Sequence, residues 1–209
     1  MKQFGEKVEG YNIPVLNERE IRGAAGILFL FLMISFLKIV FTGDFLLIKY
    51  FITAFMTDMA IRVFISPKFS PSLTIARYMV RNQTPLYVGA AQKKFAWYIG
   101  LTLATAMFIH IVIFNAYGII TGLSCFTCMI LMFFELAFGI CIGCKVFSLF
   151  NKGEVQYCPG EVCELKDRHE IQKTTPAQWL VVLAFAVLVA ALIYFFKDTF
   201  SIAPKELKF

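Results

Sequence analysis

The chain has 209 residues, of which 59% are hydrophobic and only 16% are charged, and its mean hydropathy is +0.71. Soluble domains carry about 25% charged residues, so this composition argues against a soluble enzyme domain. The formal net charge of +6 would suit nucleic acid, but the basic residues flank apolar blocks, where they mark the cytoplasmic face of a membrane. We therefore expect a lipid bilayer around the chain and no nucleic-acid partner.

Apolar blocks of membrane-spanning length recur along the chain, because a hydrocarbon core of about 30 Å requires about 20 helical residues. The predicted fold is all-α, a polytopic transmembrane helical bundle of about five spans. Its expected parts are a cytoplasmic N-terminal tail (1–20), a four-span membrane core (21–150) with a basic cytoplasmic loop (66–94), a cytoplasmic cysteine-containing segment (151–178), a fifth span (179–196) and a C-terminal tail (197–209). Within the core, the block 119–150 is longer than one bilayer needs, which predicts a tilted helix or a helical stalk.

The orientation follows from the loop charges. The first twenty residues lack the apolar core of a signal peptide. The stretch 67–94 holds five basic residues and no acidic one, which predicts that this loop and the N-terminus are cytoplasmic and that the C-terminus is on the other side. Within the loop, a helix over SLTIARYMVR would place Leu73, Ala76 and Val80 on one face, with Arg77 and Arg81 nearby, as in a helix lying on anionic lipid. A plain connecting loop is the alternative.

Six cysteines form three close pairs: Cys125/Cys128, Cys141/Cys144 and Cys158/Cys163. The first four have the spacing C-x2-C-x12-C-x2-C, which in a soluble protein indicates a zinc site. On one continuous helix, however, the second and third of these cysteines would be about 20 Å apart, too far to bind one ion. We expect no metal and no cofactor.

The pair Cys141/Cys144 is the stronger candidate for a reactive dithiol. Residues at i and i+3 of a helix have Cβ atoms about 5 to 6 Å apart, slightly wide for a disulfide, and Gly139 and Gly143 supply the backbone adjustment that would close it. The adjacent Lys145 favours the thiolate form.

For Cys125/Cys128, ordinary buried cysteines at a helix contact are the favoured interpretation, with a redox role as the alternative. Their offset of sixteen positions from Cys141/Cys144 places the two pairs on nearly opposite sides of a straight helix. We therefore expect them to have different partners.

The third pair, Cys158/Cys163, lies in a polar segment that is expected to face a reducing compartment, where cysteine pairs are rarely structural. The segment allows a tight Pro-Gly turn that brings the two sulfurs together, although the adjacent Glu161 and Glu164 disfavour thiolates. Redox chemistry or sulfur transfer is the leading prediction, ahead of a static disulfide. Metal capture together with His169 is the weaker third option.

Two polar positions within the spans need partners. Glu135 lies in the middle of the fourth span, where a carboxylate is costly unless it is protonated or paired. It marks a proton or anion path past Cys128, or else it is neutral and hydrogen-bonded to His110 of the adjacent span. Asp58 and Arg62, four residues apart, predict a structural ion pair.

The string FGICIGCK, Phe138 to Lys145, resembles the domain-of-unknown-function family 4395 (DUF4395), a family of bacterial multi-pass membrane proteins. The resemblance extends from Asn17 to about Phe150, and includes Asn17-Glu18, the pattern from Asp58 to Pro71, and KKFAWYIG from Lys93. It implies the bacterial inner (cytoplasmic) membrane and a thioredoxin-like or rhodanese-like (sulfurtransferase) partner. In that membrane, the orientation expected from the loop charges makes the C-terminus periplasmic. The tail with Cys158, Cys163 and the fifth span departs from the shortest version of the pattern, so the resemblance implies no role for it.

Three functions remain open. The leading hypothesis is a thiol-disulfide or sulfane-sulfur relay in which Cys141/Cys144 exchange with Cys158/Cys163 and then with a soluble partner. A carrier or channel for a small sulfur anion, guided by Glu135 and His110, is the second. A non-catalytic accessory subunit of a larger membrane complex is the third, so the sequence leaves open whether the protein is an enzyme.

Overall fold

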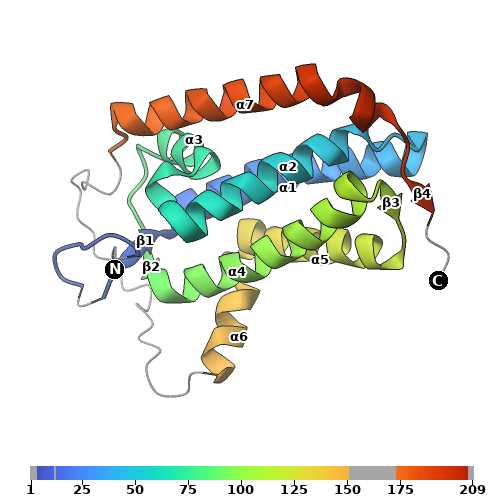
Figure 1. Ribbon diagram of the computed structural model, residues 1–209. Helices are drawn as coiled ribbons and strands as arrows, with labels where there is room; N and C mark the ends of the chain where they lie inside the picture. The colour runs from blue at the N-terminus through green and yellow to red at the C-terminus, as the bar shows by residue number, and fades with distance from the viewer. Residues whose placement is uncertain (1–3, 12, 151–172, 207–209) are drawn as a thin grey trace.

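Long helices packed side by side make up most of the protein (Figure 1). The computed structural model describes residues 4–11, 13–150 and 173–206. The long helical segments are α1 (Glu18–Thr42), α2 (Leu46–Ala60) with the π-helix η1 (Ile61–Ile65), α4 (Ala90–Met107) with the π-helix η3 (Phe108–Ile113), α5 (Ile119–Phe138) and α7 (Pro176–Ser201). Shorter helices are the 3-10 helix η2 (Pro67–Phe69), α3 (Pro71–Met79) and α6 (Ile142–Phe150). The predicted all-α bundle is confirmed.

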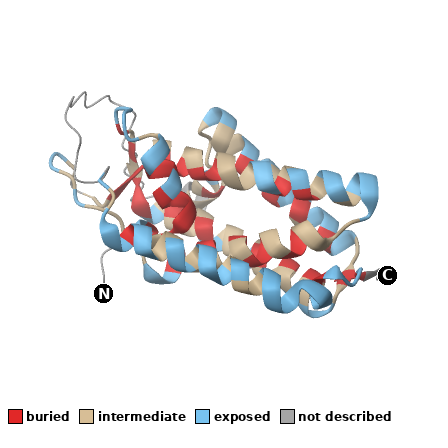
Figure 2. Ribbon diagram, turned by 90° about the horizontal axis from the view of Figure 1, so that it is seen from above, coloured by how far each residue is buried: buried red, intermediate tan, exposed pale blue. Residues whose placement is uncertain are grey.

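Four helical segments in the described part of the chain are long and apolar enough to cross a membrane: Glu18–Thr42, Ala90–Ile113, Ile119–Phe138 and Pro176–Ser201. The predicted span without a counterpart among these four is the second in chain order, which corresponds to α2, a helix of only 15 residues. With η1 the helical run covers 46–65, about 30 Å at 1.5 Å per residue, so it reaches bilayer length only through its π-helical end. Exposed residues lie along the outer faces of the helices (Figure 2), and many of them are large apolar side chains, where a water-soluble protein would be polar. The protein is a membrane protein.

Side-chain caps fix where several helices begin. Asn17 accepts a hydrogen bond from the backbone of Arg19 at the start of α1, and Ser70 accepts one from Leu73 at the start of α3. Thr175 caps α7, which continues with a proline at its first position. A capping side chain replaces hydrogen bonds that the first turn of a helix lacks. These caps explain boundaries that hydrophobicity alone does not define.

Two small β pairs tie distant segments together, which the prediction of an all-α chain did not foresee. Strand β1 (Val15–Asn17) pairs antiparallel with β2 (Tyr87–Gly89), in the register Val15 to Gly89. Strand β3 (Ala116–Tyr117) pairs in parallel with β4 (Lys205–Glu206). The first pair holds the N-terminal segment against the start of α4, and the second holds the chain after α7 against the α4–α5 turn.

The segment that the sequence predicted as an interfacial helix or a plain loop is helical, but its predicted lipid face is buried. Leu73 and Ala76 of α3 are only 4% and 0% exposed, because α3 packs against α1. Arg77, expected at the lipid surface, is also buried. Its Nε donates to Glu20 at 3.0 Å and its Nη2 lies 3.4 Å from a carboxylate oxygen of Glu6. The basic residue thus neutralises buried acids, which the sequence spacing could not show.

The core lies between α1, α2, α4 and α5, around residues such as Leu32, Ile48 and Ile52, each about 1% exposed. One cation, Lys49, is buried beside it and donates to the backbone carbonyls of Phe200 and Ile202 at the end of α7. This contact fixes the outermost helix to the bundle.

The two ends of the helical bundle carry different elements. The N-terminal segment, α3, the start of α4, the end of α5 and the start of α7 gather toward one end, and β4 lies at the other (Figure 1). Contacts at the first end include Arg77 with the carbonyl of Lys173, and Gln178 with the carbonyl of Lys68. The basic loop and the N-terminal segment therefore share one side, as their relative placement in the sequence predicted.

Candidate functional site

The site begins where α5 stops. Gly139 adopts a positive φ of 66°, which favours glycine, and its N–H bonds to the carbonyl of Glu135. The chain then leaves the axis of α5, and α6 begins at Ile142. The predicted continuous helix over 119–150 is therefore wrong, because Gly139 ends a helix that the apolar residues on both sides suggested would continue.

Cys141 and Cys144 form a disulfide directly after this break, with Cα atoms 5.2 Å apart. Cys141 immediately precedes α6, and its Sγ accepts a hydrogen bond from the N–H of Cys144 at 3.2 Å. Gly143 allows α6 to approach α4 closely, because a Cβ atom at 143 would lie 2.7 Å from the Cβ of Ala96. The proximity expected for the two sulfurs is present, although on a helix start and not within a long helix.

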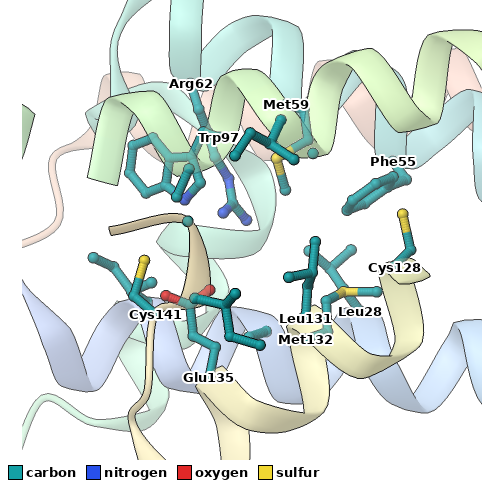
Figure 3. Close-up of a pocket in the computed structure, with 17 residues that line it drawn as sticks. Leu28, Phe55, Met59, Arg62, Trp97, Cys128, Leu131, Met132, Glu135 and Cys141 are labelled. Carbon is teal, nitrogen blue, oxygen red and sulfur yellow. The ribbon is translucent and has the colours of Figure 1, made fainter. Parts of the chain in front are cut away.

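A cavity of about 70 Å³ lies beside the disulfide, between α1, α2, η1, α4 and α5. This volume can hold more than one water molecule. Figure 3 shows Cys141 next to the carboxylate of Glu135 at one end, the guanidinium of Arg62 directed inward, and Cys128 at the other end near Phe55. Most of the remaining wall is apolar, including Leu28, Met59, Trp97, Leu131 and Met132.

Cys125 and Cys128 are both buried free thiols on α5. Only Cys128 is part of the cavity wall. The expectation that the two cysteine pairs face opposite sides is wrong, since the break at Gly139 turns Cys141 back toward the same cavity as Cys128. The two thiols therefore differ in their access to the cavity, although their spacing in the sequence does not distinguish them.

Glu135 has a partner that the sequence did not suggest. Its Oε1 accepts from Lys93 Nζ at 2.7 Å, and the same ammonium lies 2.8 Å from Glu18 Oε2. The three side chains come from α5, α4 and α1, and Lys93 is only 3% exposed. In the sequence, Lys93 belongs to the predicted basic loop and Glu18 to the predicted N-terminal tail. The only sequence feature that pointed to this contact is that Lys93 and Glu18 both lie next to the ends of apolar blocks.

The predicted hydrogen bond between Glu135 and His110 is wrong. Lys93 and His110 are seventeen positions apart on the helical run of α4 and η3, which is about 25 Å at 1.5 Å per residue. His110 instead packs beside Phe114, with ring centres 6.2 Å apart. Within the described residues its Nδ1 has no hydrogen-bond partner.

The predicted ion pair of Asp58 and Arg62 is confirmed, at 2.9 Å, with both side chains 3% exposed. The structure adds two partners, because the hydroxyls of Ser70 and Ser72 bond to both charged groups. The Arg62 guanidinium also lies over the ring of Trp97, 5.2 Å from its centre. Of this network, Arg62 and Trp97 line the cavity.

The electrostatics outside the spans are set by burial and by local hydrogen bonds. Burial raises the pKa of Glu6 above its ordinary value, although Arg77 and Lys68 oppose this effect. A hydrogen bond from Lys38 lowers the pKa of Asp44 in the turn between α1 and α2. Glu6 belongs to the end of the bundle that carries the disulfide, and Asp44 to the opposite end.

The third cysteine pair, Cys158 and Cys163, and His169 lie outside the described residues. Among residues 4–11, 13–150 and 173–206, no three His, Cys, Asp or Glu side chains converge to hold a metal ion. The chemistry visible in the site is therefore that of a disulfide, a free thiol and paired carboxylates.

Comparison with known proteins gives one match. The model of a family described as Domain of unknown function (DUF4395) matches residues 16–152. No curated protein and no solved structure matches the chain. The matched range covers α1 to α6, and so contains the cavity, the disulfide and the carboxylates on Lys93.

Proposed function

The chain belongs to the DUF4395 family, and because that description names no activity, we propose a function from the chain's own residues: thiol–disulfide exchange in the membrane through the Cys141–Cys144 couple. The observation that carries this proposal is a disulfide placed at a helix start beside a cavity. A buried cysteine that only fills space needs neither a partner sulfur nor an adjacent cavity.

The two sulfurs have unequal roles. Cys141 precedes the first turn of α6, and the N–H of Cys144 points at its Sγ. Backbone N–H groups and the dipole at a helix N-terminus stabilise a thiolate. Cys141 is therefore the better leaving group, and a partner attacks at Cys144.

The exchange balances with a dithiol partner. A partner thiolate attacks Sγ of Cys144, a mixed disulfide forms, and the Cys141–Cys144 bond breaks with its electron pair on Cys141. The second partner thiol then attacks the partner sulfur of the mixed disulfide and releases Cys144. The partner becomes a disulfide, the two cysteines become thiols, and the two protons of the partner dithiol are taken up by them.

A thioredoxin-like dithiol protein fits this reaction better than a rhodanese-like sulfur donor. A disulfide is the two-electron oxidised form of a dithiol, whereas a sulfane-sulfur carrier holds its extra sulfur on a single free thiol. The relay would continue to Cys158 and Cys163, which follow α6 in the chain.

The proposed location is the bacterial inner membrane, with the disulfide end of the bundle and the N-terminus cytoplasmic and the C-terminus periplasmic. The support is charge: the loop 67–94 at that end has basic residues and no acidic one. Basic loops stay on the cytoplasmic side of the membrane. A soluble partner would then reach Cys144 from the cytoplasm.

Thiol trapping in cells tests the proposal. Cells are quenched in acid, free thiols are alkylated with a mass-adding reagent, and oxidised and reduced forms are separated on a gel. Cys141→Ser should accumulate a mixed disulfide on Cys144, because the Cys141 thiol that displaces the partner is missing and only the partner's second thiol remains to resolve it, and Cys144→Ser should not. Cys125→Ser is the matched control and should behave as the parent protein. The proposal fails if the Cys141–Cys144 pair stays in one redox state under oxidising and reducing growth and neither single variant captures a partner.

A further inference from the structure

The buried carboxylates on Lys93 are a feature that the exchange reaction described so far does not use. Glu18 and Glu135 contact the same ammonium at 2.8 Å and 2.7 Å, and their side chains are 10% and 16% exposed. A single ion pair would need only one acid. Burying a second carboxylate is costly unless more positive charge is near.

The additional positive charge is Arg22 on α1. Its guanidinium donates to the carbonyls of Leu136 and Ala137 at 3.2 Å and 3.3 Å, on the last turn of α5 next to Glu135. Two carboxylates, one ammonium and one guanidinium sum to zero. Arg62, the cation that lines the cavity, is compensated by its own partner, Asp58. The cluster is therefore balanced while the cysteines are joined as a neutral disulfide.

Reduction disturbs that balance. When the disulfide opens, Cys141 becomes a thiolate, and the charge of Cys141 together with this cluster becomes −1 beside a mostly apolar wall. Lys145, which follows Cys144, is exposed to solvent and is not counted in the cluster. A buried unpaired charge is neutralised by binding a proton where it can. Glu135 is the acid of the cluster whose carboxylate lies beside Cys141 on the cavity wall, whereas Glu18 is not part of that wall.

We propose that Glu135 relays the proton that accompanies the opening and closing of the Cys141–Cys144 disulfide, with Lys93, Glu18 and Arg22 holding the carboxylate and balancing its charge. On reduction, Glu135 takes a proton from water and passes it to Sγ of Cys141, which forms an S–H bond. On oxidation, Glu135 accepts that proton, and the Cys141 thiolate attacks Cys144 in the mixed disulfide and expels the partner thiolate.

This inference rests on the proposed function, and the test separates the two. The full chain is reduced in detergent micelles, freed of reductant, and oxidised by a small neutral disulfide across mildly acidic to mildly alkaline pH. Closure of the Cys141–Cys144 bond is followed by acid quench and alkylation. Because the charge of this oxidant does not change over the pH range, any pH dependence of the closure rate comes from the protein.

Glu135→Gln is expected to slow closure by about 10²-fold, the usual contribution of one acid–base group, and to remove one step from the pH profile of the rate. Glu135→Asp should restore that step, because it restores a carboxylate. Asp44→Asn is the control: it removes a carboxylate that is paired with Lys38 at the opposite end of the bundle, and it should keep the step. A residue that only supports the fold would change the rate equally at every pH.

The outcomes are distinct. If the parent protein does not close or open its disulfide at all, the proposed function fails. If it does, but Glu135→Gln keeps the parent rate and pH profile, only the proton relay is overturned. If Glu135→Gln does not fold, the parent protein and Glu135→Asp provide the test. The relay is overturned if, in both proteins, the pH dependence of the closure rate shows one thiol ionisation and no second step.

Discussion

Replacing Asp58 by Asn would leave Arg62 as a buried charge without its counterion, and the structure sets the size of that effect. Both side chains are 3% exposed and lie 2.9 Å apart. Asp58 also accepts hydrogen bonds from the hydroxyls of Ser70 and Ser72. An Asn side chain offers one acceptor and one donor there, so that an N–H would face the guanidinium or a hydroxyl.

Breaking a buried ion pair by removing one partner costs about 3 to 5 kcal/mol, because the remaining charge stays desolvated. With 1.36 kcal/mol for each factor of ten, this is roughly a 150- to 5,000-fold shift toward the unfolded state. Asp58→Asn and Arg62→Gln should each show it. The double variant Asp58→Leu/Arg62→Met, which leaves no buried charge, should lose less than the two single losses added together.

The assay is reversible unfolding in mixed micelles, with both single variants, the double variant and a surface control. Asp44→Asn serves as the control, because it breaks the Lys38–Asp44 pair, whose side chains are 47% and 34% exposed. An exposed pair contributes about 0 to 1 kcal/mol. If Asp58→Asn is no more destabilising than Asp44→Asn, or if the double variant loses the full sum, then the network does not act as a coupled buried unit.

Three further outcomes follow from the packing, the cavity and the charges. Gly143→Val should destabilise the protein by about 1 to 3 kcal/mol through overpacking against α4 and slow disulfide closure, whereas Gly122→Val, where a Cβ meets nothing within 4 Å, should do neither. After reduction, a small neutral thiol reagent should modify Cys128 faster than Cys125, because only the former lines the cavity; equal rates would contradict this access route. Burial raises the pKa of Glu6, so its contribution to stability is present below the ordinary glutamate pKa and is lost as pH rises through the raised value. Glu6→Gln should remove that decline from the pH dependence of unfolding, and an unchanged profile would show that its burial does not affect titration.

The sequence predicts features that depend on local composition and spacing. Spans follow from apolar length, and the Asp58–Arg62 pair follows from two opposite charges four positions apart on a helix. Contacts between distant segments have no such signal. Lys93 and Glu135 are 42 positions apart, and each has other plausible interpretations, a loop cation and a lone membrane carboxylate.

Gly139 shows why the break in the fourth span was missed. A glycine between apolar stretches can soften a continuing helix or end it, and the flanking sequence favours neither. A tertiary contact determines that the helix ends here. A Cβ atom at position 139 would lie about 3.3 Å from the Arg22 guanidinium, and the same guanidinium donates hydrogen bonds to the carbonyls just before the break. Arg22 is more than a hundred positions away in the chain.

That contact links the parts of the site. Inside a membrane, a helix can end only if its free carbonyls find partners, and Arg22 supplies them at the end of α5. The cation that permits the break also balances a second buried carboxylate near Lys93, and the break itself creates the new helix start at which Cys141 sits. The helix end, the acid pair and the disulfide therefore depend on one another. Arg22 should accordingly be as important to the redox behaviour of Cys141 as any residue that lines the cavity, although it lies outside that wall.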